Sequence, residues 1–414
     1  MRHTPNRREF LQASAALGIA AQSSALGSAL RPFSQDAPAV RTLVVVFLRG
    51  GADFLNMIIP RDDLTYSLMR PTVGIGEENG LVPLDADWGL HPALAPLEPL
   101  YKEKLLAPMV CVGSPHATRS HFDAQDFMEN AAPGSRTVHS GWLNRYLQAT
   151  AGEGRGSFRA LAMQGLLPQS LRGKHPALAV SRAVERKGAW SVLDSFESLY
   201  DADGMGDGET MDAGAKLGDV VESGKVTIET LRQYRDIIAT ADPADHGYPT
   251  DGFGRGLRRI GQVLESGEEL EIAGIDLNGW DHHAGLGAAE GPQATKLARM
   301  AQALAAFRKH MGPRMNRIMV MVMTEFGRSV IENGSAGTDH GHGAGMLLLG
   351  GGVQGGKVHG EWRGLSPGRL YQGRDLPVTT DFRDVFADVL REHLDFKAPR
   401  GFFPDHKPQR LKLF

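Results

Sequence analysis

Five runs of apolar residues constrain the fold of this chain more than any other feature of its sequence. The first run reads TLVVVFL, from Thr42 to Leu48, and a continuous run this rich in β-branched residues is typical of a strand buried on both faces. The other runs are Leu105 to Val112, Leu270 to Leu277, Ile318 to Met323 and Met346 to Leu349. The sequence therefore predicts a sheet whose strands are largely buried.

Helical patterns lie between several of these runs. From Ala294 to Met311, apolar residues recur at spacings of three and four, and the same holds from Phe382 to Leu394. Alternating strands and helices predict an α/β fold with a doubly wound, mostly parallel sheet and helices on both faces. In such folds ligands bind beyond the carboxyl ends of the strands, so the polar residues that follow the apolar runs are the candidate site.

The length of 414 residues exceeds the roughly 250 to 300 residues over which a single core usually grows. We expect one elaborated domain over residues 39–398 and a C-terminal tail over residues 399–414. Residues 185–261 differ from the rest, because they are rich in glycine, acidic from Asp201 to Asp207 and helical in pattern from Val226 to Ile238. We interpret this segment as a helical insertion or cap.

The N-terminus, residues 1–38, has the features of an export signal and a linker. Residues 6–12 read NRREFLQ, and a mildly apolar stretch of small residues follows from Ala13 to Leu30. This order resembles a twin-arginine signal, which predicts a periplasmic or otherwise exported protein with the twin-arginine translocase as a transient partner. The alternative is an amphipathic cytosolic helix. Because Gln22, Ser23 and Ser24 interrupt the stretch, we expect no stable membrane anchor.

Charge and cysteine content exclude some classes of protein. The chain has 45 Lys and Arg against 48 Asp and Glu, a formal net charge of −3, which argues against a polybasic protein that binds nucleic acid. The single cysteine, Cys111, allows no intrachain disulfide and lies in an apolar run, where a thiol usually behaves as a small buried hydrophobe.

Two short windows carry the strongest chemical signal. Residues 280–283 read WDHH and residues 338–343 read TDHGHG, and together they hold four of the 15 histidines. Imidazole nitrogen and carboxylate oxygen are the usual ligands of a catalytic divalent ion, and Asp53 follows the first predicted strand in the same way. For a single Asp-His pair, helix capping or mutual hydrogen bonding is the simpler explanation. Two windows with Asp53 favour a metal site.

A second motif, Arg119 to Asp126, follows the second predicted strand and reads RSHFDAQD. Ser120 is a candidate nucleophile at the start of a helix, where Arg119 and the helix amides favour an anionic group. Ser120 is equally acceptable as the N-cap of a helix from Phe122 to Glu129. His121 either orients a neighbour or packs.

A third motif, Thr324 to Arg328, follows the fourth predicted strand and reads TEFGR. Glu325 is a candidate ligand, or an acceptor behind a ligand, and Arg328 is a candidate clamp for a phosphate or sulfate group. The same spacing is that of an ordinary ion pair on a helix.

These motifs together, in this order, resemble the bacterial family called domain of unknown function 1501 over about residues 41 to 395. The segments that carry the resemblance are the twin-arginine start, VVFLRGGAD at residues 45–53, RSHFDAQD at 119–126, GWL at 141–143, TEFGR at 324–328 and GTDHG at 337–341.

The resemblance implies an alkaline phosphatase-like fold, because the family is grouped with the alkaline phosphatase and sulfatase superfamily. It implies one or two divalent ions at the strand ends, a nucleophile at a helix start and the anion-holding residues Arg119 and Arg328. The superfamily's ligand order matches these positions: Asp53, Ser120 as nucleophile, Asp281 with His283, Asp339 with His340, and His342. His282 is the alternative to His283.

We therefore expect an exported metal-dependent hydrolase that acts on a small anionic substrate, a phosphate or sulfate ester, with Zn, Mn, Mg or Ca as the ion. Hydrolysis of such inert esters requires a barrier lowered by roughly 20 kcal/mol, which metal ions help to supply. The alternative is a non-catalytic periplasmic protein that keeps the hydrolase fold and acts in the assembly or secretion of a protein partner.

Overall fold

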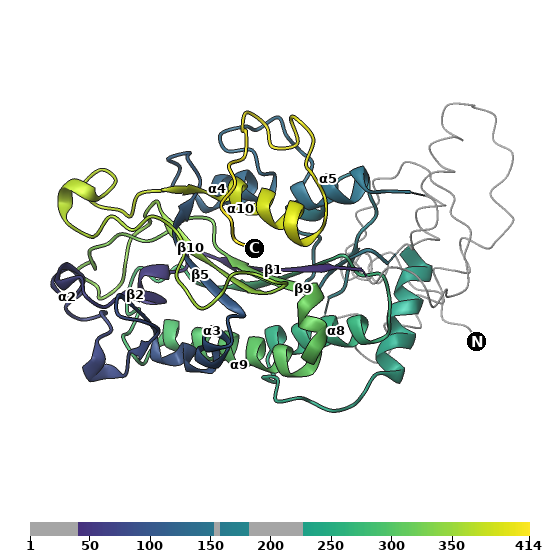
Figure 1. Ribbon diagram of the computed structural model, residues 1–414, viewed down its shortest axis with the longest axis horizontal. Coiled ribbons are helices and arrows are strands. Elements are labelled where there is room, and N and C mark those ends of the chain that lie inside the picture. The colour runs from purple at the N-terminus through teal and green to yellow at the C-terminus, as the bar shows by residue number, and fades with distance from the viewer. Residues whose placement is uncertain (1–39, 153–157, 182–226) are drawn as a thin grey trace, which may run out of the picture. The chain divides into compact units, whose positions relative to one another are not determined.

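The computed structural model describes residues 40–152, 158–181 and 227–414 (Figure 1). The export signal predicted at residues 1–38, the acidic residues Asp201 to Asp207 and part of the predicted insertion lie outside the described residues. The chain divides into two compact units. Among the described residues, the first unit comprises residue 40, His139–Pro243 and Arg259–Ala273, and the second comprises Arg41–Val138, Ala244–Arg258 and Gly274–Phe414.

All five predicted apolar runs form strands. Their bounds are Thr42–Arg49 (β1), Leu106–Gly113 (β5), Ile272–Asn278 (β8), Ile318–Met323 (β9) and Ala344–Gly350 (β10), and a short strand, Thr380–Asp381 (β11), joins them. In the second unit the order of neighbouring strands is β11-β5-β10-β9-β1-β8, with β8 beginning in the first unit. The mixed α/β fold with a large, mostly parallel sheet is thus as predicted.

One strand, β10, runs against its neighbours. β1 pairs with β9 in parallel and β5 with β11 in parallel, whereas β10 is antiparallel to both β5 and β9. Residues 324–343, which connect β9 to β10, contain no helix, and a return without a crossover helix gives an antiparallel neighbour. The start of β10 therefore lies at the same edge of the sheet as the carboxyl ends of β5 and β9.

Helices cover both faces of this sheet in the second unit. Figure 1 shows α9 (Pro292–Met311) and α3 (Glu98–Lys102) on one face, and α4 (His121–Glu129) and α10 (Phe382–Asp388) on the other. The predicted helix at Phe382 to Leu394 is α-helical only to Asp388, because Val389–His393 forms a π-helical turn. Short α2 (Leu64–Met69) lies in the chain between β2 (Ile58–Pro60) and β3 (Val82–Pro83), and these two strands pair with β4 (Trp88–Leu90) in a small antiparallel sheet.

The core lies between the sheet and these helices. The apolar positions of α9 that were expected to face inward are at most 1% exposed, and they include Leu297, Met300, Leu304 and Phe307. Burying each such side chain stabilises the fold by about 1.5 to 3 kcal/mol. Phe402, Phe403 and Leu413 are also buried, so the segment predicted as a tail packs within the second unit.

The first unit contains α5 (Trp142–Ala149), the parallel pair β6 (Ala160–Ala162) and β7 (Leu178–Ala179), and helical residues 227–240. Helix α8 (Gly252–Glu265) begins in the second unit and ends in the first.

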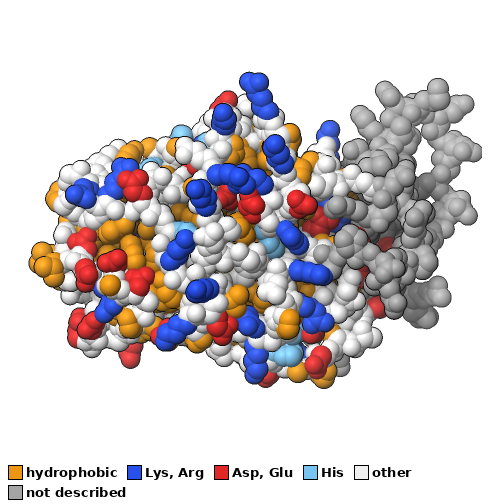
Figure 2. Space-filling model, in the orientation of Figure 1, with side chains coloured by type: hydrophobic (Ala, Val, Ile, Leu, Met, Phe, Trp, Pro, Cys, Tyr) orange, Lys and Arg blue, Asp and Glu red, His pale blue; other side chains and the backbone are white. Residues whose placement is uncertain are grey.

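Among the described residues, no helix combines the length and apolar character that crossing a membrane requires. On the face shown in Figure 2, basic and acidic side chains are interspersed.

Candidate metal centre

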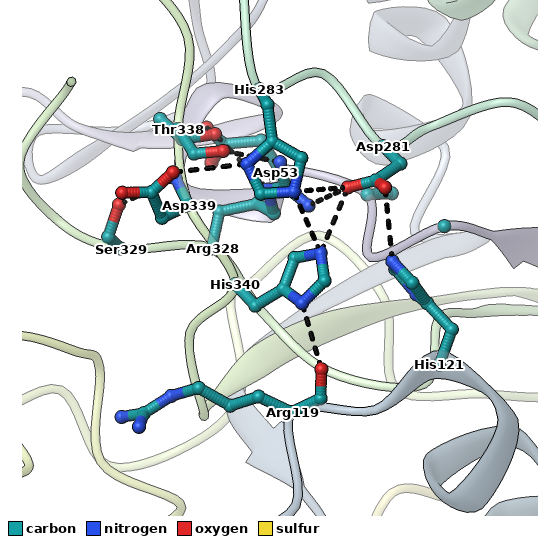
Figure 3. Close-up of polar contacts among 12 residues, drawn as sticks. Asp53, Arg119, His121, Asp281, His283, Arg328, Ser329, Thr338, Asp339 and His340 are labelled. Carbon is teal, nitrogen blue, oxygen red and sulfur yellow. Dashed lines mark hydrogen bonds and ion pairs between the residues drawn. The ribbon is translucent and has the colours of Figure 1, made fainter. Parts of the chain in front are cut away.

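Two loops and one helix bring four side chains together at the carboxyl ends of the strands. His121 is the first residue of α4, Asp281 and His283 follow β8, and His340 lies in the loop between β9 and β10 (Figure 3). We call these four residues the metal centre. They belong to the second unit, so the site lies within one compact part of the chain.

The ligand atoms of the metal centre converge closely. One atom each of His121, Asp281 and His340 lie within 4.8 Å of one another. The His283 Nε2 atom lies 2.9 Å from His340 Nε2 and 3.0 Å from Asp281 Oδ1. His340 Nε2 is 3.1 Å from the same carboxylate oxygen, and His121 Nε2 is 3.3 Å from Asp281 Oδ2.

The other nitrogen of each imidazole, Nδ1, faces an oxygen that only accepts hydrogen bonds. These oxygens are Glu325 Oε1 at 2.8 Å from His121, Asp339 Oδ1 at 3.0 Å from His283, and the Arg119 carbonyl at 2.8 Å from His340. Each Nδ1 therefore carries the hydrogen, and in a neutral imidazole the Nε2 atom then carries a lone pair. Among the described residues, His121 Nε2 is buried without a hydrogen-bond partner.

Three lone pairs and a carboxylate thus face one another, and none of the four groups donates a hydrogen to another. Such an arrangement is electrostatically unfavourable unless a cation lies in the gap. The pattern is that of metal-binding histidines, which usually donate their second ring N–H to a carboxylate or a backbone carbonyl. The residues present fit a divalent ion with three nitrogen ligands and one oxygen ligand.

Glu325 lies behind His121 and is fully buried. Its carboxylate accepts hydrogen bonds from the Gly50 amide at 2.9 Å, from Gln125 Nε2 at 2.9 Å and from the Thr324 hydroxyl at 3.0 Å. Burial acts to raise the pKa of Glu325, but the hydrogen bonds from His121 and Gln125 lower it overall. The hydrogen bond to Glu325 in turn raises the pKa of His121 in spite of burial.

Arg328 holds the carboxylate of the metal centre. Its side chain is 1% exposed, and its Nη1 atom donates to Asp281 Oδ1 at 2.7 Å. Burial acts to raise the pKa of Asp281, but its lowering, to about 2, owes most to the hydrogen bond and the charge of Arg328. Asp281 is therefore ionised throughout the physiological range.

Gly50 allows the loop after β8 to come close to the end of β1. Its φ is +119°, and a Cβ atom there would lie 2.8 Å from the backbone nitrogen of Asp281. Only glycine fits a position of this conformation and crowding.

The other predicted ligands lie outside the metal centre. Asp339 contacts His283 through Nδ1 and accepts from Asn333, and the hydrogen bond from His283 lowers the pKa of Asp339. Asp53 is buried in an ion pair with Arg70, at 2.8 Å. His342 stacks on Tyr371, with ring centroids 4.1 Å apart. His283, rather than His282, joins the cluster.

The predicted catalytic residues also have defined places. Ser120 is the N-cap of α4, with an exposed side chain whose Oγ accepts from the Asp123 amide at 3.5 Å. The guanidinium group of Arg119 points away from the imidazoles (Figure 3) and donates to Asp375 at 2.5 Å and to Gln372 at 3.1 Å.

Comparison with known families gives a match over more than half of the chain. The family described as "Protein of unknown function (DUF1501)" matches residues 110–397. The chain belongs to this family. No curated protein has a sequence that matches this DUF1501 chain.

Two solved structures align with most of the DUF1501 chain. The C-terminal periplasmic domain of EcEptC from Escherichia coli, in complex with Zn, is 12% identical with a TM-score of 0.34, and the alignment covers 78% of this chain and 77% of that one. The phosphonate monoester hydrolase of Agrobacterium radiobacter is 9% identical with a TM-score of 0.33, over 89% of this chain and 78% of that one. At these TM-scores the fold assignment rests on the strands and helices described above.

Sequence reasoning did not place His121 among the ligands of the DUF1501 chain. A signal was present, because His121 follows β5 and so lies at the same edge of the sheet as Asp281 and His340. The motif RSHFDAQD instead indicated Ser120 as a nucleophile, with His121 orienting a neighbour or packing. The role of Arg70 had no sequence signal, since its partner Asp53 lies 17 residues earlier in an unrelated segment.

Proposed function

We propose that this protein is an exported, metal-dependent hydrolase of phosphate or sulfate esters. The observation that carries the proposal is the convergence of three imidazole Nε2 atoms on the Asp281 carboxylate, with each Nδ1 held by an acceptor. Two further points support phosphate or sulfate esters as the substrate class. The motifs resemble those of the alkaline phosphatase and sulfatase superfamily, and the site lies at the strand ends.

Zn²⁺ is the proposed ion. Three imidazoles and one carboxylate suit Zn²⁺ better than Ca²⁺ or Mg²⁺, which favour oxygen ligands, or Mn²⁺, which also suits carboxylates. When bound, a divalent ion supplies Lewis acidity to an ester oxygen. The chain's own part is to bind through His121, His283 and His340, and to fix those rings through Glu325 and the other acceptors.

Ser120 is the proposed nucleophile. It directly precedes His121 and its side chain is exposed. Its Oγ would attack the phosphorus or sulfur atom, and the alcohol would leave with the hydroxyl proton. Water would then release phosphate or sulfate from Ser120 and restore its hydroxyl group.

A non-catalytic protein that keeps the metal centre is the second candidate, and one observation favours it. Arg119 and Arg328, the residues predicted to hold the substrate anion, both donate to protein acceptors, namely Asp375 and Asp281. A non-catalytic metal-binding protein binds no substrate anion, so both of its arginines can stay paired with protein carboxylates.

The test combines elemental analysis with turnover of a panel of aryl phosphates and aryl sulfates by the purified full chain. We expect bound metal and turnover, both lost in Asp281→Asn and both retained in the matched control Asp62→Asn, an exposed carboxylate outside the site. Metal without turnover in the unmodified protein favours the non-catalytic candidate. Absence of metal contradicts both.

Export is tested separately by cell fractionation. We expect the chain in the periplasm, and we expect Arg7→Lys with Arg8→Lys to retain it in the cytoplasm. An unchanged distribution of the double variant would contradict the twin-arginine route.

A further inference from the structure

We infer that the metal centre takes a single divalent ion, because two buried guanidinium groups hold the carboxylates that a second ion would need. The inference rests on the proposed function, since it requires the four residues of the metal centre to bind an ion. It assigns Arg70 and Arg328 the place that a second cation would otherwise occupy.

The first guanidinium group, that of Arg70, holds Asp53. Their side chains are 0% and 2% exposed, and Arg70 Nη1 lies 2.8 Å from Asp53 Oδ2. Arg70 also donates to Asn56 Oδ1 at 2.6 Å and to the carbonyl oxygens of Ser329 and Val330, each at 2.9 Å. Because four acceptors fix the guanidinium group, it cannot turn away from Asp53 without leaving several buried donors unpaired.

The second guanidinium group, that of Arg328, lies between Asp53 and the metal centre. Arg328 donates from Nη1 to Asp281, from Nη2 to the Thr338 carbonyl and from Nε to the Thr338 hydroxyl. The Thr338 hydroxyl donates in turn to Asp53 Oδ2 at 3.3 Å. Figure 3 shows Asp53, Thr338, Arg328 and Asp281 together.

The charges of this region match one divalent ion. Four carboxylates, those of Asp53, Asp281, Glu325 and Asp339, contact the two guanidinium groups or the imidazoles of the centre. With two guanidinium groups, the set carries two net negative charges, which one divalent ion neutralises. A second such ion would lie beside buried cations without compensating charge.

One oxygen of Asp53 remains without a partner. Among the described residues, Asp53 Oδ1 is buried with no hydrogen bond. In the same part of the chain, however, the only group of three convergent His, Cys, Asp or Glu ligands is that of His121, Asp281 and His340. A second Zn²⁺ at Asp53 would therefore have at most two such protein ligands, fewer than Zn²⁺ takes in catalytic or structural sites.

The test is a count of bound metal on the full chain, stripped of metal and titrated with Zn²⁺ by calorimetry, with elemental analysis after dialysis. We expect one equivalent. Two tight equivalents, with one lost in Asp53→Asn, would overturn the inference and leave the proposed function intact. No bound equivalent would remove the proposed function itself.

Two variants test which of the two carboxylates, Asp53 or Asp281, the bound ion requires. Asp53→Asn is expected to keep one equivalent with affinity within about threefold, whereas Asp281→Asn is expected to lose about 100-fold or more. Circular dichroism shows whether each variant folds. If Asp53→Asn does not fold, Thr338→Val replaces it, because it breaks the link from Asp53 to Arg328, and one retained equivalent is again expected. A loss of the equivalent in Thr338→Val with native circular dichroism would contradict the separation of Asp53 from the ion.

Discussion

Each unit of the chain contains a buried cluster of charged side chains, and the two clusters differ in how completely their groups are paired. In the first unit, Arg159 and Glu271 form a bidentate ion pair at 2.6 and 2.8 Å, with side chains 1% and 4% exposed. Tyr146 donates to Glu271, while Arg159 also donates to the Leu147 carbonyl and the Thr150 hydroxyl. Donors and acceptors are matched, so this cluster needs no ion.

The metal centre in the second unit has a surplus of acceptors. Three Nε2 atoms and the Asp281 carboxylate meet, and only Arg328 donates among them. Asp281 and His283 are also 41% and 46% exposed, so an ion can reach them from solvent. The comparison teaches that the balance of donors and acceptors, rather than the number of charges or their burial, distinguishes a cation site from a structural ion pair.

The largest expected effect on stability comes from a change in the cluster of Arg159 and Glu271 in the first unit. Arg159→Met leaves Glu271 buried without its cation, so we expect the free energy of unfolding to fall by about 3 to 5 kcal/mol. Metal affinity is expected to stay unchanged. Urea denaturation and Zn²⁺ titration measure the two quantities, and a lower affinity in a folded variant would break the distinction between the clusters.

His393 offers a buried imidazole without a carboxylate, and it predicts a dependence of stability on pH. Its Nε2 atom contacts the Thr42 carbonyl at 2.8 Å, and burial lowers its pKa to about 4. Between pH 4 and about 6.5 the unfolded chain binds more protons than the folded chain at this histidine. The contribution of neutral His393 to the free energy of unfolding is therefore fully present above a pH of about 6.5, and about 3 kcal/mol of it is lost as the pH falls to 4.

Denaturation across this pH range tests the effect. We expect His393→Gln to flatten that part of the profile, and we expect the exposed control His139→Gln to leave it unchanged. An unaltered profile in His393→Gln would assign the pH dependence to other groups.

Glu325→Gln tests whether the acceptor behind His121 matters for the ion. The amide removes the charge and its side chain can present a donor to the ring, so we expect metal affinity to fall by about 10- to 100-fold. Zn²⁺ titration measures the change, with Glu332→Gln, a carboxylate outside the metal centre, as the control. Equal affinity in both variants would show that ring orientation is set without Glu325.

The smallest expected effect on stability is that of Ser120→Ala. Loss of this N-cap is expected to lower the free energy of unfolding by about 1 kcal/mol, with metal affinity unchanged. The informative measurement is turnover: full activity would exclude Ser120 as the nucleophile, whereas lost activity with retained metal would support it.

Much of the fold follows from sequence because apolar runs and helical spacings report burial directly. The run from Thr42 to Leu48 and the spacing in α9 both predicted what the structure contains. The direction of β10 could not be predicted from its run, because an apolar strand looks the same in either direction. It depends on the connection from β9, which lacks a helix.

The site was predictable only where neighbouring residues share a motif. Asp281, His283 and His340 were expected together, and the structure brings them together. Asp53 and His342 were expected with them on the same grounds. Their actual neighbours, Arg70 and Tyr371, belong to segments with no signature of their own, so pairing in three dimensions was invisible in the sequence.

The absence of a side chain at Gly50 has a consequence for any variant of this protein. The methyl group of an alanine at this position would meet the backbone nitrogen of Asp281, so the turn that carries this ligand would have to move although every ligand is still present. The spacing on which ion capture depends is therefore set partly by a residue that never touches the ion.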